Sequence, residues 1–189
     1  CPPGARTGGT VGRVGHPSPR AAPPRDAARA EQVRATRQKV LGAARDLFLR
    51  RGYTGATIEA IAQRAAVSPQ TVYNVVGGKA ALLKAVYDVA LAGDDEPVPV
   101  GDRPAFADIA AAPDARSALA LYARLGCQMY ARAGRLIAVV FAEGAARDPD
   151  LRAFVGKIEE ERRTGTAGMA HHVATTFGLP DGLTEAEAA

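Results

Sequence analysis

Tryptophan is absent from this sequence, and cysteine occurs only twice, at Cys1 and Cys127. Two cysteines exclude a disulfide framework and a cysteine-based zinc site, and such a count is typical of the reducing cytoplasm. We interpret Cys127 as a small core residue within a helix. No run of eighteen apolar residues is present, so a transmembrane helix is not expected. The arginine-containing N-terminus also lacks the apolar segment of a secretory signal.

Motifs that carry catalysis are also missing. We find no Gly-rich phosphate loop with a lysine, no Ser/His/Asp set in a recognisable context and no zinc-ligand spacing. His171 and His172 are adjacent, and adjacent residues on a helix point about 100° apart, so the pair cannot chelate one ion as an i, i+4 pair does. We therefore predict that the protein is not an enzyme, and we expect no cofactor and no metal site.

Acidic residues are scarce in the first half of the chain. Residues 1–93 carry 14 Lys/Arg against 5 Asp/Glu, whereas residues 94–189 carry 10 against 15. The formal net charge of the whole chain is +4. A basic half followed by an acidic half is typical of a protein whose first half meets a polyanion. Solvated arginines on a surface and a tail would give the same balance, so charge alone leaves both interpretations open.

Proline and glycine divide the chain into four segments. Residues 1–27 are rich in Pro, Gly, Ala and Arg without apolar periodicity, which predicts a disordered basic arm. Residues 93–104, rich in Gly, Asp and Pro, predict a linker. We expect one helical domain at 28–92 and a second at 105–189. Thr184 has the character of a helix N-cap close to the last residue, so we expect the second domain to be truncated here.

Apolar residues repeat with a helical period through both domains, and they predict an all-α fold. The first helix keeps Val33, Val40 and Phe48 on one apolar face and ends before Gly52. In the second domain, Gly134 is interpreted as a helix stop. The helices are predicted over 28–51, 57–65, 69–75, from 79 onward, 105–112, 114–133, 136–146 and 149–177.

Two of these helices are short and separated by a brief turn. Residues 57–79 read TIEAIAQRAAVSPQTVYNVVGGK. Thr57 is a good N-cap for the first, and Ser68 followed by Pro69 starts the second. Two short helices with a three- to four-residue turn have helix-turn-helix geometry. The alternative is a helical hairpin from some other all-α protein.

The second short helix carries uncharged polar side chains rather than the Glu and Lys of a solvated face. Gln and Asn can bind adenine bidentately, and Thr offers a methyl group to thymine. The Tyr73 hydroxyl can reach a phosphate, although a core aromatic is the alternative. Lys79 and Thr57 each stand at a helix start, where free N–H groups favour a phosphate, although Lys79 could be an ordinary solvated lysine. The candidate DNA-binding residues are Thr57, Ser68, Pro69, Gln70, Thr71, Tyr73, Asn74 and Lys79.

The segment from Arg37 to Val86 resembles the DNA-binding domain of the TetR family of repressors. The resemblance is carried by residues that recur at the family's spacing over about fifty positions. They are Ala43-Ala44, Leu47-Phe48, Gly52-Tyr53, Ala56-Thr57-Ile58, Ile61-Ala62, Ala65-Ala66-Val67-Ser68, Thr71-Val72-Tyr73, and Lys79 followed by Leu82-Leu83.

The sequence departs from the family pattern at four positions. The family usually has His or Tyr two residues after the motif tyrosine and then Phe, whereas this chain has Val75 and Val76. The Ser or Asn usual before the motif lysine is Gly78, and the glycine usual before the motif threonine is Gln70. We expect these changes to alter the set of DNA contacts rather than the fold.

The resemblance implies a homodimeric repressor that a small molecule releases from a palindromic double-stranded DNA operator. It further implies that the last two helices form the dimer interface and that the ligand lies among the middle helices. Weak candidates to line that cavity are Arg124, Tyr130, Arg132 and Phe141, although Tyr and Phe are also common in cores. We expect a cytoplasmic protein with no membrane partner. The alternatives are a helical enzyme or cofactor-binding protein and a non-specific architectural DNA protein.

Overall fold

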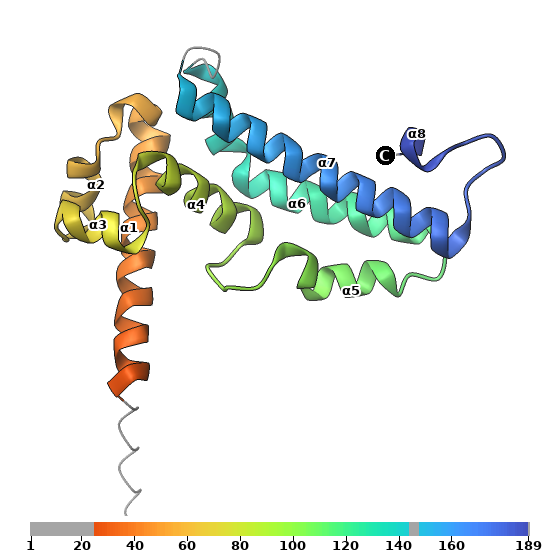
Figure 1. The fold of residues 1–189 in the computed structure, drawn as a ribbon, viewed down its shortest axis with the longest axis horizontal. Helices are drawn as coiled ribbons and strands as arrows, with labels where there is room; N and C mark the ends of the chain where they lie inside the picture. Colours follow the sequence, from red (N-terminus) through yellow and green to blue (C-terminus); the bar gives the residue numbers. More distant parts are fainter. Residues whose placement is uncertain (1–24, 144–147, 189) are drawn as a thin grey trace, which may run out of the picture.

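A computed structural model describes residues 25–143 and 148–188, and within these ranges the protein is helical without a strand. This confirms the all-α fold class. None of the helices in the described ranges is long and apolar enough to cross a membrane. The elements, shown in Figure 1, are α1 (Arg25–Gly55), α2 (Ile58–Ala65), α3 (Pro69–Val75), α4 (Lys79–Ala92), the short 3₁₀ turn η1 (Val100–Asp102), α5 (Pro104–Ala110), α6 (Ala115–Ala142), α7 (Pro149–Phe177) and α8 (Glu185–Ala188).

Side-chain caps define where most of these helices begin. Asp114 accepts a hydrogen bond from the backbone N–H of Ser117 at 2.7 Å and starts α6. Asp148 accepts from the N–H groups of Asp150 and Leu151 and starts α7, with proline at the first helical position. These contacts satisfy N–H groups that have no partner within the helix. The chain therefore encodes its helix starts locally, and Thr184 caps α8 in the same way, as predicted.

The predicted boundaries of α3 and α7 are confirmed, but the predicted stop at Gly134 is wrong. Helix α6 runs without a break from Ala115 to Ala142. A glycine within a helix costs about 1 kcal/mol relative to alanine. Leu136 and Val140, just beyond it, are buried in the core, and burial of such side chains contributes about 1.5–3 kcal/mol each. Tertiary packing therefore outweighs the local preference of Gly134.

Two further expectations about single residues are corrected. The helical period predicts Val33 on the packed face of α1, but its side chain is 51% exposed. Figure 1 shows the reason: the first turns of α1 extend beyond α2, α3 and α4, so few partners surround them. Cys127 is exposed on α6 rather than buried, because α6 turns other residues toward the core. The predicted arm at 1–27 falls mostly outside the described residues, and α1 already includes residues 25–27.

One apolar core joins the first four helices to α6 and α7. Phe48 of α1, Ile61 of α2, Val72 of α3 and Leu83 of α4 are buried in the same cluster as Leu151 of α7. A second, smaller cluster joins α5, α6 and the later part of α7. Figure 1 shows α6 and α7 side by side, with α4 and α5 below them in the view. The division into domains at 28–92 and 105–189 stays a prediction, and the first core extends across it.

Candidate nucleic-acid interface and ligand cavity

Helices α2 and α3 are held at a fixed angle by apolar residues on their inner faces. Ile58 and Ile61 of α2 and Val72 of α3 are buried. Thr57 caps α2 by accepting from the N–H of Ala60 at 3.1 Å. The turn passes through Ala66, whose φ of 55° lies in the left-handed region. This unusual conformation for a residue with a side chain ends α2 and reverses the chain into α3.

The outer face of α3 is exposed and uncharged. Ser68, Pro69, Gln70 and Asn74 are exposed, and Thr71 is half-buried. The Tyr73 side chain is 53% exposed, so the alternative of a core aromatic does not describe it. The surface that α3 presents consists of hydroxyl and amide groups, the groups that read base edges in a major groove.

Hydrogen bonds within α3 orient several of these side chains. Ser68 Oγ accepts from the N–H of Thr71 at 3.1 Å and lies 2.9 Å from the Thr71 hydroxyl. Gln70 Nε2 donates to Asn74 Oδ1 at 2.9 Å. This bond uses one donor and one acceptor, so the carbonyl oxygen of Gln70 and the amide nitrogen of Asn74 keep capacity for an outside partner. The pair therefore presents an acceptor and a donor from consecutive turns of one helix.

Lys79 lies at the first position of α4 and contacts the end of α1. Its Nζ donates to the carbonyl oxygen of Thr54 at 3.2 Å and lies 4.4 Å above the centre of the Tyr53 ring. A lysine ammonium carries three donors, so the contact to Thr54 leaves others for a phosphate. Lys79 is half-buried, and it is therefore positioned by α1 rather than being an ordinary solvated lysine.

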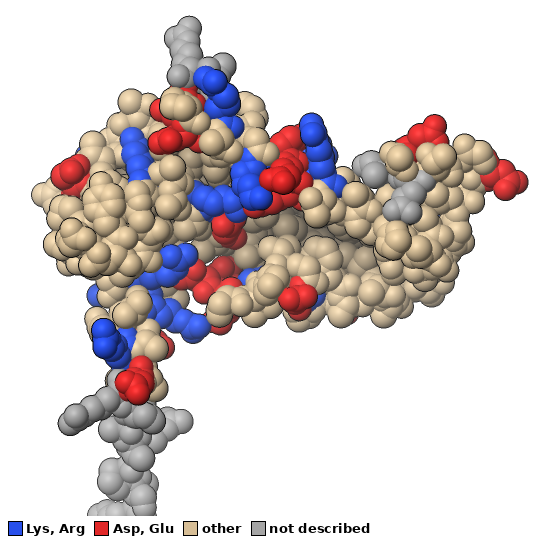
Figure 2. All heavy atoms as spheres, viewed as in Figure 1, with Lys and Arg blue, Asp and Glu red and all other residues tan. Residues whose placement is uncertain are grey.

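Charged side chains are distributed unevenly over the surface. On the face shown in Figure 2, Lys and Arg lie along α1 and near α4, with Asp and Glu side chains among them, and α1 as a whole carries more basic than acidic residues. Helix α3 contains no charged residue. The arrangement places a neutral polar recognition surface next to a basic helix. This is the division of labour that duplex DNA requires, with cations for the phosphates and amides or hydroxyls for the bases.

Residues 40–86, from the buried part of α1 into α4, match the sequence model described as "Bacterial regulatory proteins, tetR family". These residues form a TetR-type helix-turn-helix domain. The chain is a DNA-binding transcriptional regulator with a helix-turn-helix domain, and proteins of this family are in general regulators rather than enzymes. No curated protein matches the chain.

Two of the departures from the family pattern, Val75 and Val76, make contacts that hold the end of α3 in place. Val76 packs against the core cluster, and the carbonyl oxygen of Val75 accepts from Arg37 Nη1 at 3.3 Å. Gly78 lies beside the Tyr73 ring: a Cβ added to Gly78 would be 4.0 Å from a carbon of that ring. Although Val75, Val76 and Gly78 are smaller than the residues usual in the family, the end of α3 remains hydrogen-bonded to α1. The small Gly78 leaves the Tyr73 ring without a side chain packed on it from that position.

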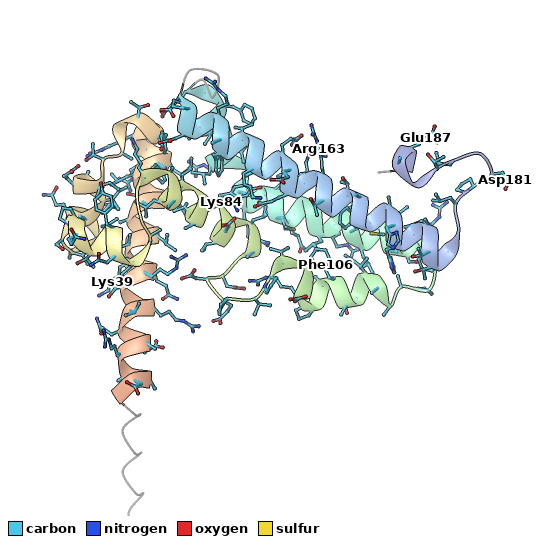
Figure 3. The ribbon with its side chains drawn as sticks, viewed as in Figure 1. Lys39, Lys84, Phe106, Arg163, Asp181 and Glu187 are labelled. Atoms are coloured by element: carbon cyan, nitrogen blue, oxygen red, sulfur yellow. The ribbon has the colours of Figure 1, made fainter. Side chains whose placement is uncertain are left out.

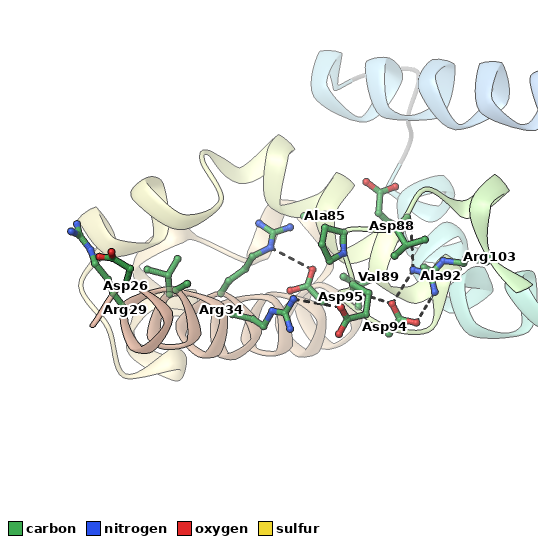
Figure 4. A pocket seen from close by; sticks show the side chains of 16 residues that line it. Asp26, Arg29, Arg34, Ala85, Asp88, Val89, Ala92, Asp94, Asp95 and Arg103 are labelled. Carbon is green, nitrogen blue, oxygen red and sulfur yellow. Dashed lines mark hydrogen bonds and ion pairs between the residues drawn. The ribbon is translucent and has the colours of Figure 1, made fainter. Parts of the chain in front are cut away.

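Two arginines of α1, together with Arg103 just before α5, hold the acidic turn that follows α4. Figure 4 shows this polar cleft. Arg37 Nε lies 3.4 Å from Asp95 Oδ1, and Arg34 lies 3.4 Å from Glu96. Arg103 donates twice to Asp94, at 2.6 and 2.9 Å, and these bonds lower the pKa of that carboxyl to about 2. The end of α3 is thus linked through Arg37 and the turn to the start of α5.

A joint between α1 and the two long helices lies near Gly52, where α1 is kinked because the backbone leaves the helical conformation (φ 73°, ψ 177°). No sequence pattern provides a signal for this joint. Glu143, at the end of α6, accepts from the N–H and the hydroxyl of Thr54 at 2.8 and 2.9 Å. The Tyr53 hydroxyl donates to Asp150 at 3.0 Å, and burial together with that carboxylate raises the pKa of Tyr53. These partners are distant in sequence, so no local pattern relates them. The joint connects the end of α1 with both long helices.

A mainly apolar cavity of about 500 Å³ lies among α4, α5, α6 and α7. Of the residues suggested by the sequence, Tyr130 lines it, whereas Arg124 and Phe141 do not. Phe141 is 57% exposed on α6. Arg132 donates instead to the carbonyl oxygens of Ala90 and Leu91 at the end of α4. A part in ligand binding stays a prediction for Arg124, Tyr130 and Phe141.

Proposed function

We propose that this protein is a homodimeric repressor that binds a palindromic double-stranded DNA operator and leaves it when a small molecule binds. The observation that carries the proposal is the exposed, uncharged polar face of α3, flanked by Thr57 and Lys79 at helix starts. Such a regulator acts on chromosomal DNA, so we place it in the cytoplasm.

The recognition helix supplies the base contacts in this proposal. Ser68, Gln70, Thr71 and Asn74 read base edges, and Pro69 starts the helix that carries them. A bidentate amide–adenine contact contributes about 1–3 kcal/mol of discrimination against a wrong base. The hydrogen bond between Gln70 and Asn74 supports a joint role, because removal of either side chain frees the other to rotate.

Phosphate contacts set the register of that helix on the duplex. Thr57, Tyr73 and Lys79 supply these contacts, with Lys79 held in place by the Thr54 carbonyl. Removal of one cationic phosphate contact, as in Lys79→Ala, should reduce the slope of log affinity against log salt by about 0.9.

One helix-turn-helix buries little surface on DNA, so tight binding requires two. A symmetric dimer would place two copies of α3 in successive major grooves, about 34–36 Å apart. The operator would then have the two-fold symmetry of the protein.

Release by a ligand requires that the cavity and α3 be mechanically connected. The continuous core, the Arg132 contacts to the end of α4 and the joint between Glu143 and Thr54 support such a connection. A ligand with higher affinity for one spacing of the two recognition helices would shift the population toward it.

Selection of bound sequences from random duplex DNA tests the proposal. A palindromic consensus with half-sites one helical turn apart is expected, and sedimentation of the complex should give two chains per duplex. Recovery of unselected sequences would replace the proposal with a non-specific architectural DNA protein.

Three variants separate the expected contacts, measured by fluorescence anisotropy on the selected duplex. Gln70→Ala should weaken binding about tenfold or more and relax preference at one base position. Tyr73→Phe removes only a hydroxyl and should weaken selected and random DNA alike. Gln63→Ala, an exposed amide on α2, is the matched control and should bind as the unchanged protein does. Equal effects of Gln70→Ala and Gln63→Ala would contradict the assignment of α3.

A further inference from the structure

The walls of the cavity among α4, α5, α6 and α7 specify what kind of molecule fits it. Aliphatic and aromatic side chains, such as Leu91, Phe106 and Ile158, make up most of its lining. Figure 3 shows Phe106 on α5 and Lys84 on α4, the two elements that lie below α6 and α7 in the view. A molecule that fills this space must therefore be mostly apolar.

Both charged side chains on the cavity wall already have partners. Glu161 lies 2.9 Å from Lys84 Nζ, and Arg162 lies 2.8 Å from Glu159. A charged group on the ligand would lose its hydration and find no uncompensated opposite charge. Burial of an unpaired ion in an apolar site is strongly unfavourable. The cavity therefore selects against anions and cations.

Three tyrosines supply the polar groups that remain. Tyr87, Tyr122 and Tyr130 all line the cavity, and no hydrogen bond of their hydroxyl groups is found among the described residues. The Tyr87 side chain is only 3% exposed, and its ring packs edge-on against Phe154 at 5.3 Å. The hydroxyls of Tyr87 and Tyr122 are not among the sealed, unpartnered polar atoms of the described residues, so they are accessible from the cavity and can donate to a ligand there.

These hydroxyls act as donors at physiological pH. Burial raises the pKa of Tyr87 to about 12 and raises that of Tyr122. Tyr87, Tyr122 and Tyr130 line one and the same cavity, so a ligand that fills it lies against all three rings.

We propose that the cavity binds a neutral, mainly apolar molecule bearing a hydrogen-bond-accepting oxygen, which the hydroxyls of Tyr87 and Tyr122 hold. The inference rests on the proposed function for its regulatory meaning, because a ligand-responsive repressor needs such a site. The chemistry of the site itself depends only on the wall of the cavity.

Three naphthalene probes that share the same fused ring separate charge from hydrogen bonding. Prodan is neutral and carries a ketone, dimethylnaphthylamine is neutral without a carbonyl, and anilinonaphthalenesulfonate is anionic. Fluorescence titration of the full chain should give the tightest binding for Prodan, with the sulfonate about tenfold weaker or more. Equal or tighter binding of the sulfonate would overturn the proposal.

Tyrosine-to-phenylalanine variants test the hydrogen bonds without changing the shape of the wall. Tyr87→Phe and Tyr122→Phe should each weaken Prodan about fivefold and leave dimethylnaphthylamine unchanged. Tyr73→Phe lies outside the cavity and should leave Prodan affinity unchanged. If neither cavity variant distinguishes the two neutral probes, the assignment of the hydroxyls is wrong. Circular dichroism of each variant verifies that it is folded.

The same proteins keep this inference separate from the proposed function. Tyr73→Phe should weaken DNA binding but not Prodan, and Tyr122→Phe should weaken Prodan but not DNA. If Prodan binds with the expected tyrosine dependence while saturating Prodan leaves operator affinity unchanged, the cavity chemistry stands and release by this ligand fails. If DNA binding is absent while the probe pattern holds, only the proposed function fails.

Discussion

Replacement of Gly52 by alanine should damage the joint between the DNA-binding helices and α6 more than any change in the exposed face of α1. Gly52 has φ 73° and ψ 177°, a conformation almost restricted to glycine. A Cβ there would overlap the carboxylate of Glu143. The substitution must therefore both strain the backbone and expel the carboxylate that holds Thr54.

The magnitude follows from these two effects. Backbone strain of this kind costs about 1–3 kcal/mol. The two hydrogen bonds from Thr54 to Glu143 contribute about 1 kcal/mol each, the value of an ordinary hydrogen bond rather than the larger one of a charged acceptor, because Thr54 is exposed to water. Gly52→Ala should thus lower the free energy of unfolding by about 3–5 kcal/mol. For a chain of this size, Tm should fall by about 6–20 °C.

A double-mutant cycle separates the two effects. Glu143→Ala removes the hydrogen bonds and the clash, so Gly52→Ala in that background should cost only the backbone strain, about 1–3 kcal/mol. Gly42→Ala is the matched control, because a Cβ at that exposed α1 position meets nothing within 4 Å. It should stabilise the helix by about 0.5–1 kcal/mol. Urea denaturation followed by circular dichroism measures all of these proteins. An equal cost of Gly52→Ala in both backgrounds would refute the contact with Glu143.

Three other properties can be measured on the same fold. Ala66→Gly should raise the free energy of unfolding by about 0.5–1 kcal/mol, because φ of 55° strains alanine more than the added chain entropy costs; an unchanged urea midpoint would contradict this. The Asp94 carboxyl should titrate by NMR near pH 2, and Arg103→Ala should return its pKa toward about 3.9. The ionised Asp94 carboxylate therefore stabilises the fold above about pH 4, and this stabilisation is lost as the pH falls toward 2. Because the pKa of Tyr87 is raised from 10.0 to about 12, its neutral form stabilises the fold below pH 10, and this is lost as the pH rises toward 12. The stability of the unchanged protein relative to Tyr87→Phe should fall between pH 9 and 11, and a difference that stays constant over this range would contradict the raised pKa.

Local signals in the sequence are enough to predict the helix starts and the helix-turn-helix. Ser68 and Pro69 place the first turn of α3, and Thr57 places that of α2, because caps act over three or four residues. Gly134 shows where such reasoning fails. Its effect depends on whether the next turns are buried, and the sequence does not indicate which helix covers Leu136. Elements fixed by neighbours in sequence were predictable, and an element fixed by distant packing was not.

The candidate site divides in the same way. The exposure of Gln70, Tyr73 and Asn74 follows from the helical period of α3, because Val72 must face the core. The cavity could not be derived, since its wall combines residues from α4 to α7 and no periodic pattern relates them. Among the sequence candidates only Tyr130 lines it, and an amphipathic helix alone does not distinguish a cavity-facing tyrosine from an exposed phenylalanine such as Phe141.

The contacts around α4 indicate how the two halves of such a regulator would influence each other. Lys79 at the start of α4 is bonded to the end of α1, and Arg132 of α6 is bonded to carbonyl oxygens at the other end of α4. Tyr87, between these ends, lines the cavity. A ligand that displaces the Tyr87 ring must therefore move a helix that is fixed at both ends by polar contacts and along its length by the shared core. Because a packed helix shifts as a unit rather than deforming locally, the displacement would reach the recognition helix through Lys79 and α1.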